Sequence, residues 1–139
     1  MEISIEQDLT FEEYKMLRNT TTWATLTDKQ IEKLIEHSTF KVRARIDDKT
    51  VGMGRVLFDF GYNSLITDIV VDPGYQGKGI GKLIVETLIQ LVKNESSGNE
   101  YLQFNLLAAP GKSGFYEKLG FVKRDETNGY GMNLRLNAK

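Results

Sequence analysis

A glycine-rich segment, residues 71–82, holds the densest group of chemically useful residues in this sequence. It joins an apolar run that predicts a buried strand, Leu65 to Val71, to an apolar-periodic run that predicts a helix, Gly79 to about Lys93. Three glycines alternate with other residues at this junction: Gly77, Gly79 and Gly81. The first amides of a helix have no intrahelical acceptor, and glycines leave them uncovered. The junction therefore predicts an anion-binding site.

Charge and spacing at this junction narrow the choice of ligand. Lys78 and Lys82 add positive charge, which favours a diphosphate over a carboxylate. A Walker A loop would need lysine after Gly79, where the sequence has Ile80. A dinucleotide fingerprint would need glycine at the position of Lys82. Both motifs are excluded, and the structural alternative is that the glycines only turn a strand into a helix.

Composition limits the chemistry available elsewhere. The 139 residues fit one globular domain, 1–139, with 40% hydrophobic and 27% charged residues. The chain has no cysteine and a single histidine, His37, which excludes thiolate metal sites, paired-histidine metal sites and a cysteine nucleophile. We therefore expect no metal, and a catalysis that depends on tyrosine, carboxylates, backbone groups and water. His37 closes a predicted helix and suits its dipole as a cation.

The charge and hydropathy patterns bear on partners. A net charge of −1 gives no basic footprint, so we expect no nucleic acid partner. Residues 1–4 lack the basic and apolar pattern of a leader, and no run approaches the length of a membrane span. We therefore expect no membrane partner and a cytoplasmic location.

The segments before the junction alternate between helical and extended patterns. Ile3 to Ile5 predicts a short strand, and two capping boxes, Thr10 to Glu13 and Thr27 to Gln30, predict two short helices. Strict alternation predicts a strand over residues 40–46. Residues 50–60 predict a long strand, in which Gly52 and Gly54 indicate a bulge or a close approach by another backbone.

The segments after the long helix predict a strand, a helix and a closing pair of strands. Tyr101 to Leu107 reads as the strand, and the helix runs from about Gly111 to Leu119. Phe121 to Arg124 and Met132 to Leu136 then predict an antiparallel pair.

The six residues from Gln76 to Gly81 resemble the Gln/Arg-x-x-Gly-x-Gly/Ala motif of the Gcn5-related N-acetyltransferases, the GNAT family. The setting adds to the resemblance. A strand that ends in Val-x-Pro-x-Tyr precedes the motif, an amphipathic helix follows it, and the segment Gly114 to Phe121 lies further along the chain. The order of predicted elements is similar to that of the family over essentially the whole chain.

The resemblance implies a fold and a cosubstrate. The fold is α+β of the α/β sandwich type, a GNAT acyl-CoA N-acyltransferase fold with a mixed, mostly antiparallel sheet of about seven strands and about four helices. The cosubstrate is acetyl-CoA, whose pantetheine amides would pair with the backbone of Ile69, Val70 and Val71. Its diphosphate would lie on the residues of the glycine turn: Gln76, Gly77, Lys78, Gly79, Ile80, Gly81 and Lys82.

Acetyl transfer to an amine needs a base for the ammonium and an acid for the departing thiolate. The resemblance assigns the acid to Tyr116, in the family's Tyr-x-x-x-Gly-Phe pattern, although a plain core aromatic is the alternative. Asp68 is the candidate base or water relay, because apolar surroundings would favour proton uptake by a carboxylate. The alternative is a structural aspartate that accepts from a bulge or loop amide. One departure is Ala109, where many family members carry an asparagine whose hydrogen bond must be absent or replaced.

Aromatic residues predict the acceptor pocket, which the first two helices would roof. The expected walls are Tyr14, Trp23, Phe58 and Phe60, which suit a small amine with an apolar body and equally suit core packing. The sequence therefore predicts an acetyl-CoA-dependent N-acetyltransferase that acts on a small-molecule primary amine within a ternary complex, because no cysteine can carry an acyl group. The alternatives are acetylation of a protein or peptide amine, and a non-catalytic CoA-binding sensor. Family likeness also suggests a homodimer.

Overall fold

The computed structural model describes residues 2–139. They form two compact units, the first ending at Leu106 and the second running from Leu107 to Lys139. The single domain expected from the length stays a prediction. No helix within the described residues is long and apolar enough to cross a membrane.

The first unit is built on one sheet of five strands in the order β1-β2-β3-β4-β5. The strands are β1 (Ser4–Glu6), β2 (Phe40–Ile46), β3 (Lys49–Phe58), β4 (Asn63–Val71) and β5 (Gln103–Asn105). Neighbours from β1 to β4 are antiparallel, and β4 and β5 are parallel. The predicted α+β class with a mixed, mostly antiparallel sheet is confirmed, with five strands in place of about seven.

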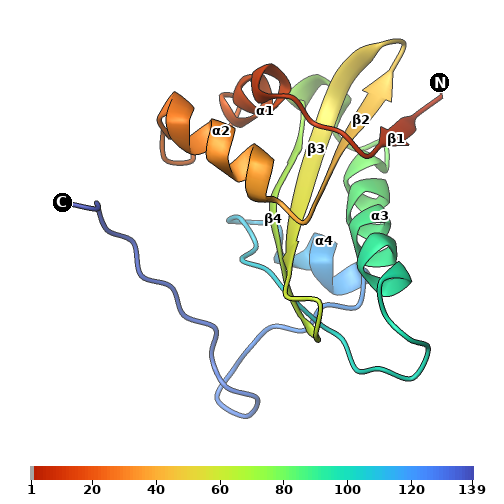
Figure 1. Cartoon of the computed structure of the whole chain (residues 1–139), viewed down its shortest axis with the longest axis vertical. Coiled ribbons are helices and arrows are strands. Elements are labelled where there is room, and N and C mark those ends of the chain that lie inside the picture. The colour runs from red at the N-terminus through yellow and green to blue at the C-terminus, as the bar shows by residue number, and fades with distance from the viewer. Residues whose placement is uncertain (1) are drawn as a thin grey trace. The chain divides into compact units, whose positions relative to one another are not determined.

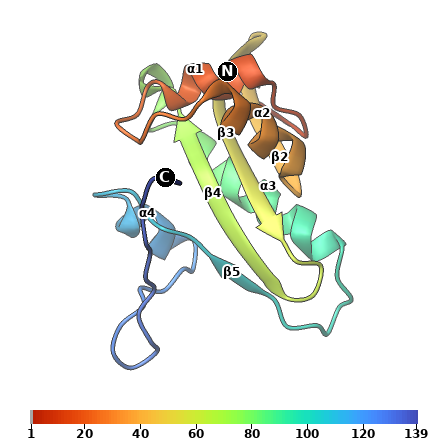
Figure 2. The same cartoon turned by 60° about the vertical axis from the view of Figure 1, so that its left-hand side comes forward.

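Helices cover both faces of this sheet (Figures 1 and 2). The two short helices, α1 (Phe11–Arg18) and α2 (Asp28–His37), lie on one face, and the long helix α3 (Ile80–Asn94) lies on the other. Both predicted capping boxes form: the hydroxyls of Thr10 and Thr27 accept from the amides of the third helical residues. Each box fixes where a short helix begins, and so which side chains reach the sheet.

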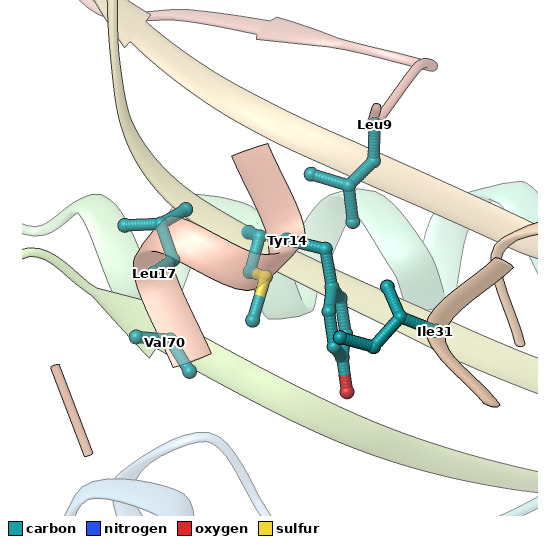
Figure 3. Packing of buried hydrophobic residues seen from close by; sticks show 6 residues of the cluster. Leu9, Tyr14, Leu17, Ile31 and Val70 are labelled. Carbon is teal, nitrogen blue, oxygen red and sulfur yellow. The ribbon is translucent and has the colours of Figure 1, made fainter. Parts of the chain in front are cut away.

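The core under α1 and α2 is apolar and fully enclosed (Figure 3). Its buried members come from both helices, the segment before α1 and two strands: Leu9, Tyr14, Leu17, Ile31, Met53 and Val70. Figure 3 shows the Tyr14 ring within this cluster, with its hydroxyl at the edge. This packing holds α1 over the centre of β3 and β4.

Two glycines of β3 allow α3 to lie close to the sheet. A Cβ atom at Gly52 would come within 2.9 Å of the Ile84 side chain, and one at Gly54 within 2.6 Å of Ile69 and Ile84. The pairing of β3 with β4 also shifts register beside Gly54. The predicted bulge is present in this pairing, with its extra residue on β4. The close approach involves mainly side chains of α3 rather than the other backbone that was given as the alternative.

The second unit contains one helix, α4 (Ser113–Lys118), which is shorter than predicted. The predicted closing pair of strands was wrong: residues 121–139 contain no strand. Met132 and Leu134 are 90% and 84% exposed. The Arg124 guanidinium donates to the carbonyls of Asn128 and Gly129, and this local turn competes with strand pairing. An isolated pair of strands is marginal without a sheet to join.

Candidate functional site

The turn between β4 and α3 is open above its glycines. A short 3-10 helix, η1 (Pro73–Tyr75), follows β4, and the Asp72 carboxylate accepts from the Gly74 amide at 2.8 Å. Gly77 and Gly79 then adopt left-handed φ angles of 79° and 82°. A Cβ atom at either glycine would meet no other atom within 4 Å. The backbone here is therefore accessible to a ligand.

The amides of this turn are donors without protein acceptors. Gly79 is the N-cap residue of α3, and no side chain caps the helix. Within residues 2–139, no protein group accepts from the amides of residues 77–82. A row of free amides at the positive end of a helix dipole binds anions. Lys78 and Lys82 are exposed beside it.

The edge of β4 next to this turn is also free. β5 pairs with β4 only at Asn63 to Leu65, so in the first unit no β5 residue pairs with Ile66 to Val71. The Gln76 side chain donates to the Val71 carbonyl at 3.1 Å and ties the turn to the strand end. The predicted backbone groups of Ile69 to Val71 and of residues 76–82 thus belong to one continuous strand, turn and helix. An open strand edge can accept an extended ligand as an added strand.

A bulge in β4 turns Asp68 towards α1. Met53 pairs with Val70 and Arg55 with Thr67, so two residues of β4 lie opposite Gly54. Asp68 has a left-handed φ of 56°. Ile69 then faces α3, and the Asp68 side chain lies on the face that α1 covers.

The surroundings of Asp68 differ from the prediction of an apolar site. Its Oδ2 accepts from the Tyr14 hydroxyl at 2.6 Å and from Arg55 Nε at 2.7 Å. Its Oδ1 lies 3.4 Å from Arg18 Nη1, and the side chain is 10% exposed. The sequence placed Asp68 among apolar strand neighbours, but the bulge moves it to two guanidinium groups and a phenol from other elements. A role as base or water relay stays a prediction.

Tyr14 contributes only its hydroxyl to this cluster. Its ring is fully buried in the core, and its role as a wall of the acceptor pocket stays a prediction. Burial and the neighbouring Asp68 carboxylate raise the pKa of Tyr14 to about 12. The phenol therefore keeps its proton and acts as a donor to Asp68.

Trp23 remains compatible with a pocket wall. The ring is half-buried, with the Arg18 guanidinium 5.5 Å from its centroid. It lines a pocket of about 460 Å³ formed by residues of 15–31. Its role in binding an acceptor stays a prediction.

Phe58 and Phe60 lie at the end of β3 that is far from the glycine turn, and their role as walls of the acceptor pocket stays a prediction. Phe58 pairs with Ser64 near the start of β4, whereas Gly52 pairs with Val71 at its end. Six residues of strand separate these positions, or about 20 Å. The two strands are antiparallel, so the end of β3 lies beside the beginning of β4. Phe58 is buried and Phe60 is 64% exposed.

A groove of about 670 Å³ between α2 and β3 was not predicted. Its ionisable lining residues are Lys29, Lys33, His37 and Arg55. The spacing of the first three residues at i, i+4 and i+8 puts them on one side of a helix, which is a signal present in the sequence. What the sequence does not indicate is that Arg55 of β3 lies opposite that side.

Tyr116 belongs to the second unit, on α4. Its ring packs edge-on against Phe115 and Phe121, with centroids 4.9 and 5.8 Å away. This burial raises the pKa of the Tyr116 phenol above its ordinary value. At the Ala109 position the backbone closes a turn, with the Lys112 amide donating to the Ala109 carbonyl at 2.9 Å, and no side chain caps α4.

Metal binding has no support from the arrangement of side chains. Over residues 2–139, no group of three or more histidine, aspartate or glutamate residues could hold a metal ion.

Comparisons with known proteins agree with this geometry. The acetyltransferase (GNAT) domain family matches residues 37–123. The uncharacterized N-acetyltransferase ycf52 of Porphyra purpurea is 30% identical over 125 residues, covering 87% of this chain and 70% of that protein. The histone acetyltransferase TAP1 of Glycine max is 40% identical over 73 residues, 52% of this chain and 30% of that protein.

A solved structure extends the likeness to nearly the whole chain. SA2161 of meticillin-resistant Staphylococcus aureus, a probable acetyltransferase, superposes with a TM-score of 0.83 and 31% identity, over 97% of this chain and 100% of that one. The family match covers more than half of the chain, including β2 to β5, the glycine turn and α4. The chain therefore belongs to the GNAT family and is an N-acetyltransferase.

Proposed function

We propose that this protein transfers acetyl from acetyl-CoA directly to the primary amine of a small molecule within a ternary complex. The observation that carries the proposal is the row of free amides at residues 77–82 beside the unpaired edge of β4. The diphosphate needs hydrogen-bond donors, and the pantetheine amides need a strand edge with which to pair. This corner of the molecule offers both.

The residues of the turn fit acetyl-CoA. The space over Gly77 and Gly79 is open to a diphosphate, which a side chain at either position would obstruct. The backbone of Ile69, Val70 and Val71 is available for the pantetheine amides. When bound, acetyl-CoA supplies an activated thioester.

Tyr116 is the proposed acid. Burial raises the pKa of its phenol, so the hydroxyl carries a proton at neutral pH and can donate it to a departing thiolate. No cysteine is available to carry the acetyl group, which supports direct transfer to the amine.

Asp68 is the proposed partner of the amine. Its Oδ2 accepts two short hydrogen bonds, whereas its Oδ1 has only the longer contact with Arg18. A carboxylate oxygen can accept more than one hydrogen bond, so Oδ1 has capacity for an ammonium group or for a water that relays its proton.

The Tyr116→Phe variant tests the proposed function. Loss of the proton donor is expected to lower kcat by about a hundredfold or more and to leave the KM for acetyl-CoA within about twofold. The measurement is thiol release with a panel of small amines and one peptide amine. Tyr130→Phe, an exposed tyrosine of the same unit, is the control. Wild-type turnover in the Tyr116→Phe variant would remove the role of this residue.

The same panel distinguishes the acceptor classes. Turnover of the peptide alone would replace the small-molecule acceptor by a protein or peptide amine. CoA binding without any thiol release would instead indicate a sensor, which GNAT membership disfavours. A homodimer and a cytoplasmic location are further proposals, based on family likeness and on sequence pattern.

A further inference from the structure

The groove between α2 and β3 combines a cationic rim with an apolar wall. Leu26, Leu34 and Leu57 supply the apolar part, and its volume of about 670 Å³ suits a small molecule. It lies on the face of the sheet that α1 and α2 cover, which is also the face of Asp68.

The rim of the groove carries lysines without ion-pair partners. Lys29, Lys33 and His37 follow one another at i, i+4 and i+8 along α2. Within the described part of the chain, none of the three forms an ion pair. The like charges of Lys29 and Lys33, four residues apart, repel each other and slightly destabilise the helix. An anion in the groove would remove that repulsion.

The groove is lined by no carboxylate. The acidic residues of α2 are Asp28, Glu32 and Glu36, and none of them contributes to the lining. Asp28 instead accepts from Lys15 at 2.8 Å. The charged side chains of the lining, Lys29, Lys33 and Arg55, are therefore all positive.

Arg55 links this groove to the candidate active site. Its Nε donates to Asp68 at 2.7 Å, and its Nη1 lies 3.4 Å from Ser38 Oγ. Its Nη2 donates to no protein group among residues 2–139, and it is not one of the buried polar atoms without a partner. The Arg55 side chain is only 14% exposed, so its guanidinium is held in place with one edge free towards the groove.

We infer that this groove binds the anionic end of the acceptor, so that the substrate is a primary amine bearing a carboxylate or phosphate group. This inference rests on the proposed function. The ammonium end of the acceptor lies towards Asp68 Oδ1, and the anionic end lies on Arg55, Lys29 and Lys33. One salt-bridged arginine thus separates the sites for the two opposite charges of the acceptor. The apolar wall contacts the carbon chain between them.

The first experiment compares matched pairs of amines by thiol release. The pairs are 4-aminobutyrate against butylamine, and 2-aminoethyl phosphate against ethanolamine. The acidic member is expected to have the lower KM. Lys33→Gln is expected to raise that KM by about threefold to tenfold and to leave the KM of the neutral member and of acetyl-CoA unchanged. Lys93→Gln, on α3, is the matched control. The pair in which the acidic amine has the lower KM shows whether the groove prefers a carboxylate or a phosphate.

The second experiment measures anion binding without catalysis. His37 is the only histidine of the chain, so its ring resonances report on the groove without ambiguity. Inorganic phosphate at constant pH is expected to shift them saturably, beyond the effect of chloride at equal ionic strength. The Lys29→Gln/Lys33→Gln double variant is expected to weaken this binding at least tenfold. An equal response to chloride, or an equal response in the variant, would overturn the anion site.

The two experiments distinguish failure of the inference from failure of the proposed function. Phosphate binding with no acetylation of any amine would refute the proposed function and leave an anion site that does not serve an acceptor. Acetylation without preference for acidic amines would refute the inference alone.

Discussion

Two turns of the first unit gather backbone amides in different ways. After β3, one oxygen of Asp59 accepts from the amides of Gly61, Tyr62 and Asn63, at 2.8, 2.9 and 3.0 Å. After β4, the amides of residues 77–82 have no acceptor among the described residues. Both turns concentrate positive backbone dipoles, but only the first contains the anion that this arrangement binds.

The difference identifies which turn serves a ligand. The backbone amides hold the pKa of Asp59 below its ordinary value, which indicates that the carboxylate is bound as an anion. In the glycine turn Asp72 accepts only from Gly74 and leaves the later amides free. A turn that supplies its own anion is structural, whereas a turn that leaves its amides free can bind a ligand.

Introducing an acidic side chain into the glycine turn is expected to have the largest effect on CoA binding. Gly77→Asp places a carboxylate beside the free amides, where it competes with the diphosphate. The Kd for CoA, measured by calorimetry, is expected to rise by at least tenfold, which is about 1.4 kcal/mol.

The matched control for this variant is Gly77→Asn. Asparagine tolerates the left-handed backbone of Gly77 and adds similar volume without charge. Acetyl-pantetheine, which lacks the diphosphate, is expected to bind both variants equally. If Gly77→Asp binds CoA as tightly as the wild type does, the free amides are not the diphosphate site, whereas an equal loss in both variants would indicate obstruction by side-chain volume alone.

Removing the anion from the other turn is expected to lower stability and leave CoA binding unchanged. Asp59→Ala leaves three amides without their acceptor and is expected to lower Tm, with a smaller fall for Asp59→Asn. Because the pKa of Asp59 is lowered on folding, its contribution is present above about pH 3.8 and is lost as the pH falls through the lower folded value. Thermal melts at a series of pH values from 7 downwards check this, since the difference in Tm between the variant and the wild type should narrow as the pH falls below 3.8. A change in the Kd for CoA would show that the two turns are not independent.

Removing a single positive charge near the open turn is expected to have the smallest effect. Lys82 is exposed, so Lys82→Gln should raise the Kd for CoA by about twofold to threefold. The difference should shrink in high salt because screening weakens interactions between exposed charges. A loss of tenfold or more would mean that the lysine, rather than the backbone, dominates the binding.

Local features of the fold were predictable because they depend on neighbours in sequence. Thr10 and Thr27 cap helices with residues three positions away, and the glycine turn is read from six successive residues. The backbone roles of residues 69–71 and 76–82 follow from the same continuous segment. Its ligand and the catalytic roles stay predictions.

Features that depend on register were not predictable. Asp68 meets Tyr14 and Arg55 only because β4 contains a bulge and α1 lies over it, and neither relation is visible in the strand's own pattern. The distance of Phe58 from the glycine turn was equally unpredictable, because the direction of β3 relative to β4 decides which end of the sheet it occupies. The closing strands were predicted from alternation, which does not indicate whether a sheet is present to receive them.

The two glycines of β3 also affect the neighbouring glycine turn. Gly52 and Gly54 contact the side chains of α3, and the open turn is the beginning of that helix. The distance between α3 and the sheet therefore determines the distance between the free amides and the end of β4. Two strand glycines that are not proposed to contact the cosubstrate thus determine the distance that it must span between the strand edge and the free amides.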